Sequence, residues 1–287
     1  MLRPTFLGFE TAKRGIATSQ KGLDITGQNM TNWDTPGYTR QRIDQVSIAP
    51  SAYRSRFATN RIGVAGQGVD ISGISQTRDS FLDKRFRDEY GEVGYYDEAY
   101  NVLSDIESAL GEFQPTSDSG IRGSLQAMFD ALQKFSNNPY SETHANIVAS
   151  EFKNMAQTLH QLDAKLTSVA EQQKYNLKVS VDEVNGILQK IAGLNDSISS
   201  DLGLAVSGNE HYGPNELLDE RNLLLDDLSR FADIEVTNLA DGTVTVKMNG
   251  HQVVAGKTFD TLKMQRDDSN STAGLYWVSS GEKAEFQ

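Results

Sequence analysis

The chain has 287 residues, of which 38 % are hydrophobic, enough to bury a core in one or two domains. Lys and Arg number 27 against 39 Asp and Glu. The resulting net charge of −12 argues against generic nucleic-acid binding, because a phosphate backbone selects basic surfaces. Cysteine is absent, which excludes disulfides, thiolate metal sites and cysteine nucleophiles.

The charge is unevenly distributed. Residues 1–62 carry a balance of +5, and the remainder carries −17. This polarity suits like subunits that pack against one another, and chance combined with solubility explains it equally simply. No stretch approaches eighteen consecutive apolar residues, and the N-terminus has no apolar run of signal-peptide length. We therefore expect neither membrane insertion nor a cleaved signal peptide.

Residues 1–33 carry a heptad pattern that predicts an N-terminal coiled-coil helix. Its apolar positions are seven residues apart, and small residues fill the second heptad position: Phe9, Ile16, Leu23 and Met30, with Ala12, Ser19 and Thr26 between them. Four glycines weaken this helix, since each costs about 1 kcal/mol relative to alanine. Two interpretations remain open: the helix becomes ordered against a partner, or it docks on its own domain.

Residues 34–75 predict an extended connector with short strands or a hairpin. Thr35 to Tyr38 form a type II turn in this interpretation, because Pro36 fixes φ at the second position and Gly37 accepts a positive φ at the third. Asn29 and Asn32 precede the turn, and their side chains can hydrogen-bond local backbone as the helix closes. Strand-like runs follow at residues 42–48 and 68–74, separated by a basic tract that contains Arg54, Arg56 and Arg61. The glycines of residues 63–68 lead into a strand, which disfavours a phosphate-binding loop.

Residues 76–232 predict an elongated helical rod domain. Thr77 and Asp79 are start signals for a helix that ends near Leu110, and further helices are predicted at residues 121–137, 141–198 and 215–231. The helix predicted at residues 141–198, about 55 residues long, would extend about 80 Å, which predicts an elongated antiparallel bundle. The aromatic and aliphatic stripes of the first two helices are interpreted as core positions.

Residues 233–287 change from a period of 3.6 to a period of 2, which predicts strands. Asp241-Gly242 and Asn249-Gly250 are hairpin turn signals. The strand series lacks a closing element, so we expect an incomplete β domain that continues beyond Gln287. The overall expectation is a mainly α protein with a smaller β part.

The sequence offers no catalytic, cofactor-binding or metal-binding motif. The four histidines are scattered without metal-ligand spacing, and no nucleophile-elbow, Walker or calcium-loop pattern is present. The acidic residues of segment 219–227 are interleaved with Arg221 and Arg230, which favours intrahelical and bundle ion pairs over a paired-carboxylate site. We therefore predict a protein that is not an enzyme.

Three motifs of the sequence are informative when they are taken together: the runs at residues 22–41, 66–82 and 213–222. They resemble segments of the bacterial flagellar axial proteins. The run G-L-D-I-T-G-Q-N-M-T-N-W-D-T-P-G-Y-T-R-Q at residues 22–41 is similar to their N-terminal signature, in which a heptad helix ends in Asn-x-x-Asn and a Pro-Gly-Tyr turn. Within it, the run Gly37-Tyr38-Thr39-Arg40-Gln41 looks most like the hook-associated proteins of the hook–filament junction. The runs at residues 66–82 and 213–222 resemble the connector with the first bundle helix and the short helix before the β domain of that family.

The resemblance implies a flagellin-like or hook-associated-protein-like rod in an exported structural subunit that lies outside the cell in the flagellum. Its implied partners are further copies of itself, the hook protein, the next junction protein, the flagellar export apparatus and a chaperone, without nucleic acid. Phe9, Ile16, Leu23 and Met30 would pair with a C-terminal heptad helix, and the Asn29–Gln41 motif would fix the turn into the connector. A hook, rod or flagellin subunit is an alternative, as is a secreted enzymatic or binding module on a helical stalk.

Overall fold

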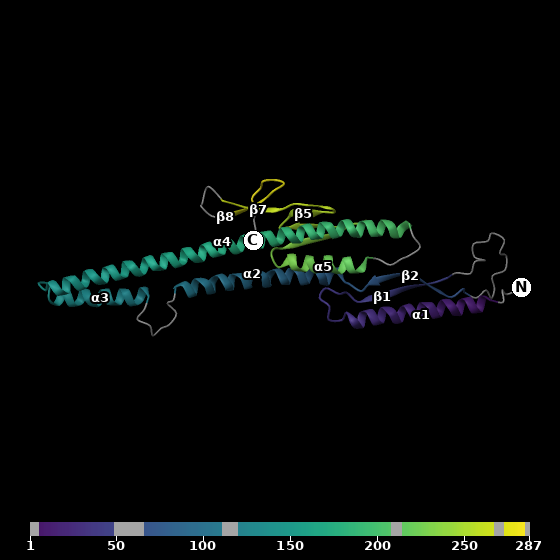
Figure 1. The fold of residues 1–287 in the computed structure, drawn as a ribbon, viewed down its shortest axis with the longest axis horizontal. Helices are drawn as coiled ribbons and strands as arrows, with labels where there is room; N and C mark the ends of the chain where they lie inside the picture. Colours follow the sequence, from purple (N-terminus) through teal and green to yellow (C-terminus); the bar gives the residue numbers. More distant parts are fainter. Residues whose placement is uncertain (1–5, 49–65, 111–119, 208–213, 267–272, 285–287) are drawn as a thin grey trace. The chain divides into compact units, whose positions relative to one another are not determined.

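The computed structural model describes residues 6–48, 66–110, 120–207, 214–266 and 273–284. Helices dominate these residues and strands form the smaller part, so the predicted class, mainly α with a β region, is confirmed (Figure 1). The basic residues Arg54, Arg56 and Arg61 lie outside the described residues, as does the start of the glycine run at 63–65.

The chain divides into two compact units. The first contains residues 1–91, 185–261 and 277–287, and the second contains residues 92–184 and 262–276. Two helices pass from one unit into the other: α2 (Ser80–Leu110) and α4 (Glu142–Ser207). At 66 residues, α4 is longer than the predicted helix and continues without a break through the polar patch after residue 169.

In the first unit, helix α1 (Leu7–Thr31) packs on the hairpin formed by β1 (Gln41–Ser47) and β2 (Val69–Gln76) (Figure 1). Thr18 and Ile25 are buried on this face of α1. A Cβ at Gly22 would lie 3.8 Å from Ile43 Cδ1, an ordinary van der Waals distance, so this glycine also lies on the face of α1 that meets the hairpin. The strands are antiparallel, with a register shift after Asp44, and confirm the predicted connector hairpin.

Helix α2 begins where the sequence predicted, because the Asp79 carboxylate accepts the backbone N–H of Phe81 at 2.9 Å and satisfies a free helix-end donor. Helix α5 (Asn215–Ser229) also lies in the first unit. A Cβ on Gly91 would lie only 3.0 Å from the Ser229 carbonyl oxygen. Glycine at this position therefore allows the backbones of α2 and α5 to approach each other closely.

The core of the first unit lies between α4, α5 and a four-stranded antiparallel sheet. The sheet consists of β3 (Ile234–Asn238), β4 (Val244–Met248), β5 (His251–Ala255) and β6 (Thr258–Phe259) in sequence order. Positive φ at Gly242, Asn249 and Gly250 confirms both predicted turns. The two-residue strand β6 was not predicted, because it is too short to show a period of 2. The fully buried aliphatic residues of this core are Leu188, Ile191, Ile198, Leu225, Leu228, Val244, Val246, Val253 and Val254.

The second unit contains α3 (Ile121–Asn137), parts of α2 and α4, and a two-stranded sheet of β7 (Leu262–Arg266) and β8 (Ala273–Trp277). The hydroxyls of Ser124 and Thr158 lie 3.2 Å apart, and Gln173 donates to the Asp105 carboxylate at 3.0 Å. These contacts join α3 and α2 to α4 within this unit.

The prediction that the bulky stripe of α2 is core was wrong for the described residues. Tyr96, Tyr100 and Leu103 are 67 %, 73 % and 65 % exposed. The buried positions of α2 are instead Arg87 and Gly94, which lie outside this stripe. Helical periodicity identifies an apolar face, but it does not reveal whether another segment covers that face.

Candidate functional site

The predicted turn after α1 is present. Tyr38 N–H donates to the Thr35 carbonyl at 3.1 Å, and Gly37 has φ +78°, which confirms the requirement for glycine at the third position. A Cβ on Gly37 would lie 3.1 Å from Leu223 Cβ of α5, so the turn packs tightly against that helix. The Pro-Gly pair therefore both reverses the chain and permits its close contact with α5.

Asn29 fastens the end of α1 to the start of β1. Its side-chain amide donates to the Gln41 carbonyl at 2.9 Å, and its Oδ1 accepts both the Gln41 N–H and the Tyr38 hydroxyl, each at 2.9 Å. The prediction of a local role for Asn29 was therefore wrong, because its partners lie beyond the turn. Asn32 does act locally, donating from Nδ2 to the Gln28 carbonyl at 3.0 Å.

The remaining motif residues have different environments. Pro36 and Arg40 are exposed, and the Arg40 carbonyl accepts the Thr77 N–H at 2.9 Å. Gln41 is 2 % exposed, and among the described residues neither polar atom of its side-chain amide has a hydrogen-bond partner. Burial raises the pKa of the Tyr38 hydroxyl, and the negative charges of Asp219 and Glu216 raise it further.

The heptad seam of α1 faces away from the hairpin. We use the name seam for Phe9, Ile16, Leu23 and Met30, which are 70 %, 61 %, 72 % and 71 % exposed. The other face of the same helix, with Thr18 and Ile25, is buried on β1 and β2. The buried face of α1 supports the interpretation that this helix docks on its own domain. The seam, which the described residues leave uncovered, supports the interpretation that the helix also meets a partner.

Helix α5 holds the connector and the sheet through the third sequence motif. Asn215 donates to the Ile74 carbonyl of β2 at 3.3 Å. Arg221, 5 % exposed, donates to Asn195 Oδ1 at 2.9 Å and to the Gly242 carbonyl at 2.7 Å. Burial, together with the positive charge of Arg87, lowers the pKa of Arg221 to about 10.

Asn195 completes this buried network from α4. Its Nδ2 donates to the Val244 and Gly256 carbonyls at 3.0 and 2.7 Å, and its Oδ1 accepts the Val244 N–H at 3.2 Å. Asn195 is fully buried, so these bonds satisfy polar groups that water does not reach. No sequence pattern indicated this role, because an asparagine within a helical pattern has no distinguishing period.

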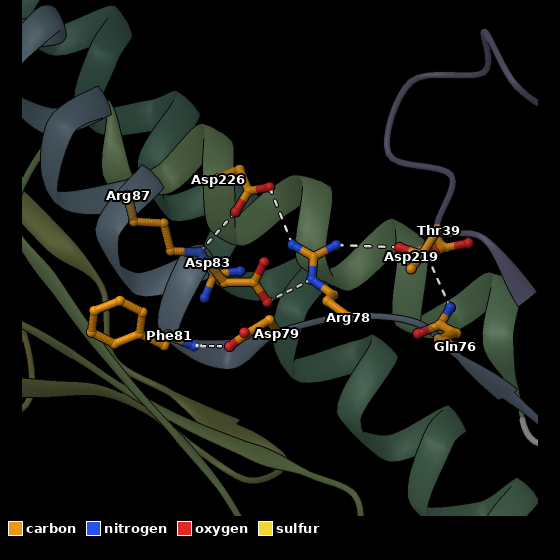
Figure 2. A network of polar contacts seen from close by, with 9 residues as sticks. All are labelled: Thr39, Gln76, Arg78, Asp79, Phe81, Asp83, Arg87, Asp219 and Asp226. Carbon is orange, nitrogen blue, oxygen red and sulfur yellow. Dashed lines mark hydrogen bonds and ion pairs between the residues drawn. The ribbon is translucent and has the colours of Figure 1, made fainter.

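An ion-pair network joins α2 and α5 (Figure 2). Arg87 Nε lies 2.7 Å from Asp226 Oδ1, and Arg78 contacts Asp83 at 2.6 Å and Asp226 at 3.5 Å. Of the predicted intrahelical and bundle ion pairs, Asp226 forms the second kind, because its partners come from α2 and from the segment before it. Arg87 is 7 % exposed, which makes its carboxylate partner more important than one at the surface.

Asp260, which follows strand β6, is the centre of a cluster of polar contacts. Asp260 Oδ2 contacts His251 Nε2 at 2.9 Å and accepts the Ser279 hydroxyl, and its Oδ1 accepts the N–H groups of Thr261 and Ser279. Burial raises the pKa of Asp260, but the hydrogen bonds from Ser279, His251 and Thr261 outweigh this effect and leave it lowered. The His251 ring stacks on Trp277 with centroids 4.3 Å apart.

The described residues contain no group of three or more His, Cys, Asp or Glu that could hold a metal ion. Within the same residues, no helix has the length and apolar character needed to cross a membrane. The candidate functional features are instead the hydrogen bonds and ion pairs around the turn and α5, together with the exposed seam of α1.

Comparison with known proteins identifies the chain as a member of a family of bacterial flagellar proteins. The family model for the helical domain of the flagellar hook-associated protein FlgK matches residues 103–286, and the chain belongs to this family. A flagellar hook-associated protein 1 of Bacillus subtilis is 32 % identical over 297 residues, with 98 % of this chain and 56 % of that protein covered. The protein of the same name from Salmonella typhimurium is 27 % identical over 248 residues, which cover 86 % of this chain and 42 % of that protein.

A solved structure shows a similar fold. The flagellar hook junction protein FlgK from Burkholderia pseudomallei aligns with a TM-score of 0.55 at 20 % identity, covering 71 % of this chain and 35 % of that one. The chain thus spans about half the length of the curated relatives that it matches. These relatives carry the hook-associated name, which favours this group over a hook, rod or flagellin subunit.

Proposed function

We propose that this chain is part of a structural subunit that assembles at the distal end of the flagellar hook and joins the hook to the filament. Membership of the FlgK family supports this function. The structural observation that carries it is the seam, a row of large apolar side chains left exposed on a helix whose other face is buried. Monomeric proteins rarely expose such a row without a partner for it.

The seam is proposed to pack against a C-terminal heptad helix in the assembled subunit, with further copies of the protein on either side. The hook protein and the next junction protein are the proposed axial neighbours. Export through the flagellar apparatus, with a chaperone and without a cleaved signal peptide, would place the subunit outside the cell. These partners follow from the family resemblance, and the uneven charge along the chain suits contacts between copies.

The test is genetic complementation with the full-length protein. Deletion of the gene should leave hooks without filaments and release flagellin into the medium. Normal filaments in the deletion strain would refute the proposed function.

A matched pair of variants tests the seam within the same assay. Ile16→Asp places a charge on the seam and should fail to restore filaments, because a carboxylate is costly to bury in an apolar contact. Ala17→Asp adds the same charge at the next residue, which is exposed but lies about 100° away around the helix. It should restore filaments, and equal failure of both variants would contradict the role of the seam.

A further inference from the structure

The carboxylate of Asp219 receives both ends of the connector hairpin. Thr39, two residues before β1, donates to it through its hydroxyl and its backbone N–H. Gln76, the last residue of β2, donates from Nε2 to Asp219 Oδ1 at 2.9 Å (Figure 2). Residues 37 positions apart in the chain thus converge on one side chain of α5.

Neighbouring contacts leave this carboxylate little freedom. Asp219 is 8 % exposed, and the same Gln76 amide also donates to the Asn215 carbonyl at 2.8 Å, one turn earlier in α5. Arg78 Nη1 donates to the Thr39 hydroxyl oxygen at 3.4 Å. Hydrogen bonds to an ionised, buried acceptor contribute more than bonds between neutral groups.

The segment that Asp219 holds is itself fixed to α1. Asn29 bonds to Tyr38 and to both backbone groups of Gln41, which flank Thr39 on either side. A continuous series of hydrogen bonds therefore runs from α1 through the connector to α5. Its links to α1 and to α5 are separate side chains, so each can be removed without the other.

We propose that Asp219 is a positioning residue that fixes the orientation of α1 relative to α5. This inference rests on the proposed function, because the orientation matters only if α1 enters an assembly. The contact of Gly37 with Leu223, one helical turn after Asp219, limits the approach of the connector but supplies no hydrogen bond. Asp219 supplies the directional bonds that select one orientation.

The experiment measures the orientation directly in the chain as it stands. Because the chain has no cysteine, Ser19→Cys in α1 and Lys190→Cys in α4 provide two unique spin-label sites at exposed residues of the first unit. Pulsed electron resonance then gives the distribution of distances between the labels. The variants are Asp219→Ala, which removes the bonds of this carboxylate to Thr39 and Gln76 but leaves those of Asn215 to β2, and Asp219→Asn, which keeps one acceptor oxygen.

We expect a narrow distribution for the unmodified side chain and a wider one for Asp219→Ala. The population outside the main peak should rise at least about 10- to 100-fold, the effect of losing one bond to a charged acceptor, because the variant loses three such bonds. Asp219→Asn should give an intermediate width. Thr39→Val, which removes one donor, should widen the distribution alone but add little in combination with Asp219→Ala.

Two outcomes separate a positioning role from a purely structural one. If Asp219→Ala lowers the thermal unfolding midpoint but leaves the distance distribution unchanged, the inference is wrong. A wider distribution together with an intact β3–β6 sheet, measured by hydrogen exchange, supports it. The distance measurement needs no assembly, so its result stands even if the deletion strain refutes the proposed function.

Discussion

The hydrogen bonds of Asn29 give a quantitative prediction for Asn29→Ala. The substitution removes three bonds of 2.9 Å, two to the backbone of Gln41 and one to the Tyr38 hydroxyl. At about 0.5–1.5 kcal/mol each, these bonds contribute about 3 kcal/mol, and the better helix propensity of alanine returns about 0.6 kcal/mol. The expected net loss of local stability is therefore about 2–2.5 kcal/mol.

Native-state hydrogen exchange can measure this loss. The amides of Ile43 and Ile74, which face each other in the β1–β2 hairpin, should exchange about 30- to 70-fold faster in the variant. The amide of Val246 in β4 serves as an internal control and should change little, since β4 belongs to a different sheet. Global unfolding would accelerate all three amides together.

Asn32→Ala is the matched control for the chemistry of the substitution. Asn32 is also an asparagine at the end of α1, but its amide donates to the Gln28 carbonyl of its own helix. We expect less than a fivefold change at Ile43, because the hairpin receives no bond from this residue. The reasoning is refuted if both variants act equally, or if Asn29→Ala changes the hairpin amides less than threefold.

Three further substitutions test other contacts. Gly37→Ala should destabilise the chain in urea by about 2 kcal/mol, because it combines a positive φ with a Cβ 3.1 Å from a side-chain carbon of α5. The control is Gly250→Ala, where φ is +83° and the space around the Cβ is open, so only the backbone cost of about 1 kcal/mol should appear. The lowered pKa of Asp260 means that its carboxylate stabilises the fold above pH 3.8 and loses this effect as pH falls through the folded-state pKa. The thermal unfolding midpoint of Asp260→Asn should therefore depend less on pH across that range. Asp226→Ala should lower the free energy of unfolding by about 3–5 kcal/mol, because it leaves Arg87 buried without its carboxylate. The double variant Asp226→Ala with Arg87→Met should recover part of this loss in calorimetry. No recovery would contradict the role assigned to the ion pair.

The raised pKa of Asp219 has the opposite sign from that of Asp260. Burial raises it more than the bonds from Thr39 and Gln76 and the charge of Arg78 lower it. The folded state therefore holds this proton more strongly than the unfolded state, and stability falls as pH rises from 3.8 through the folded-state pKa. The two carboxylates act in opposite directions in a pH titration, so their variants must be measured separately.

The sequence by itself determined the features that depend on local chemistry. Pro36 and Gly37 defined the turn because their backbone preferences are intrinsic, and Asn249 and Gly250 defined a hairpin for the same reason. Asp79 marked the start of α2 because a carboxylate at that position satisfies a free helix N–H. Heptad and alternating periods located the long helices and most strands, whose residue spacing repeats along the chain.

Only the tertiary structure decided which distant groups meet. The bonds of Asn29 to Gln41 and of Asp219 to both ends of the hairpin join residues that no local pattern connects. The burial of Arg221 beside Asn195 likewise depends on how α4, α5 and the sheet pack. Periodicity also could not tell that the α2 stripe is exposed, because an apolar face looks the same in sequence whether it is covered or free. The physical reason is that side-chain spacing sets the faces of an element, whereas burial depends on the other elements that fold against it.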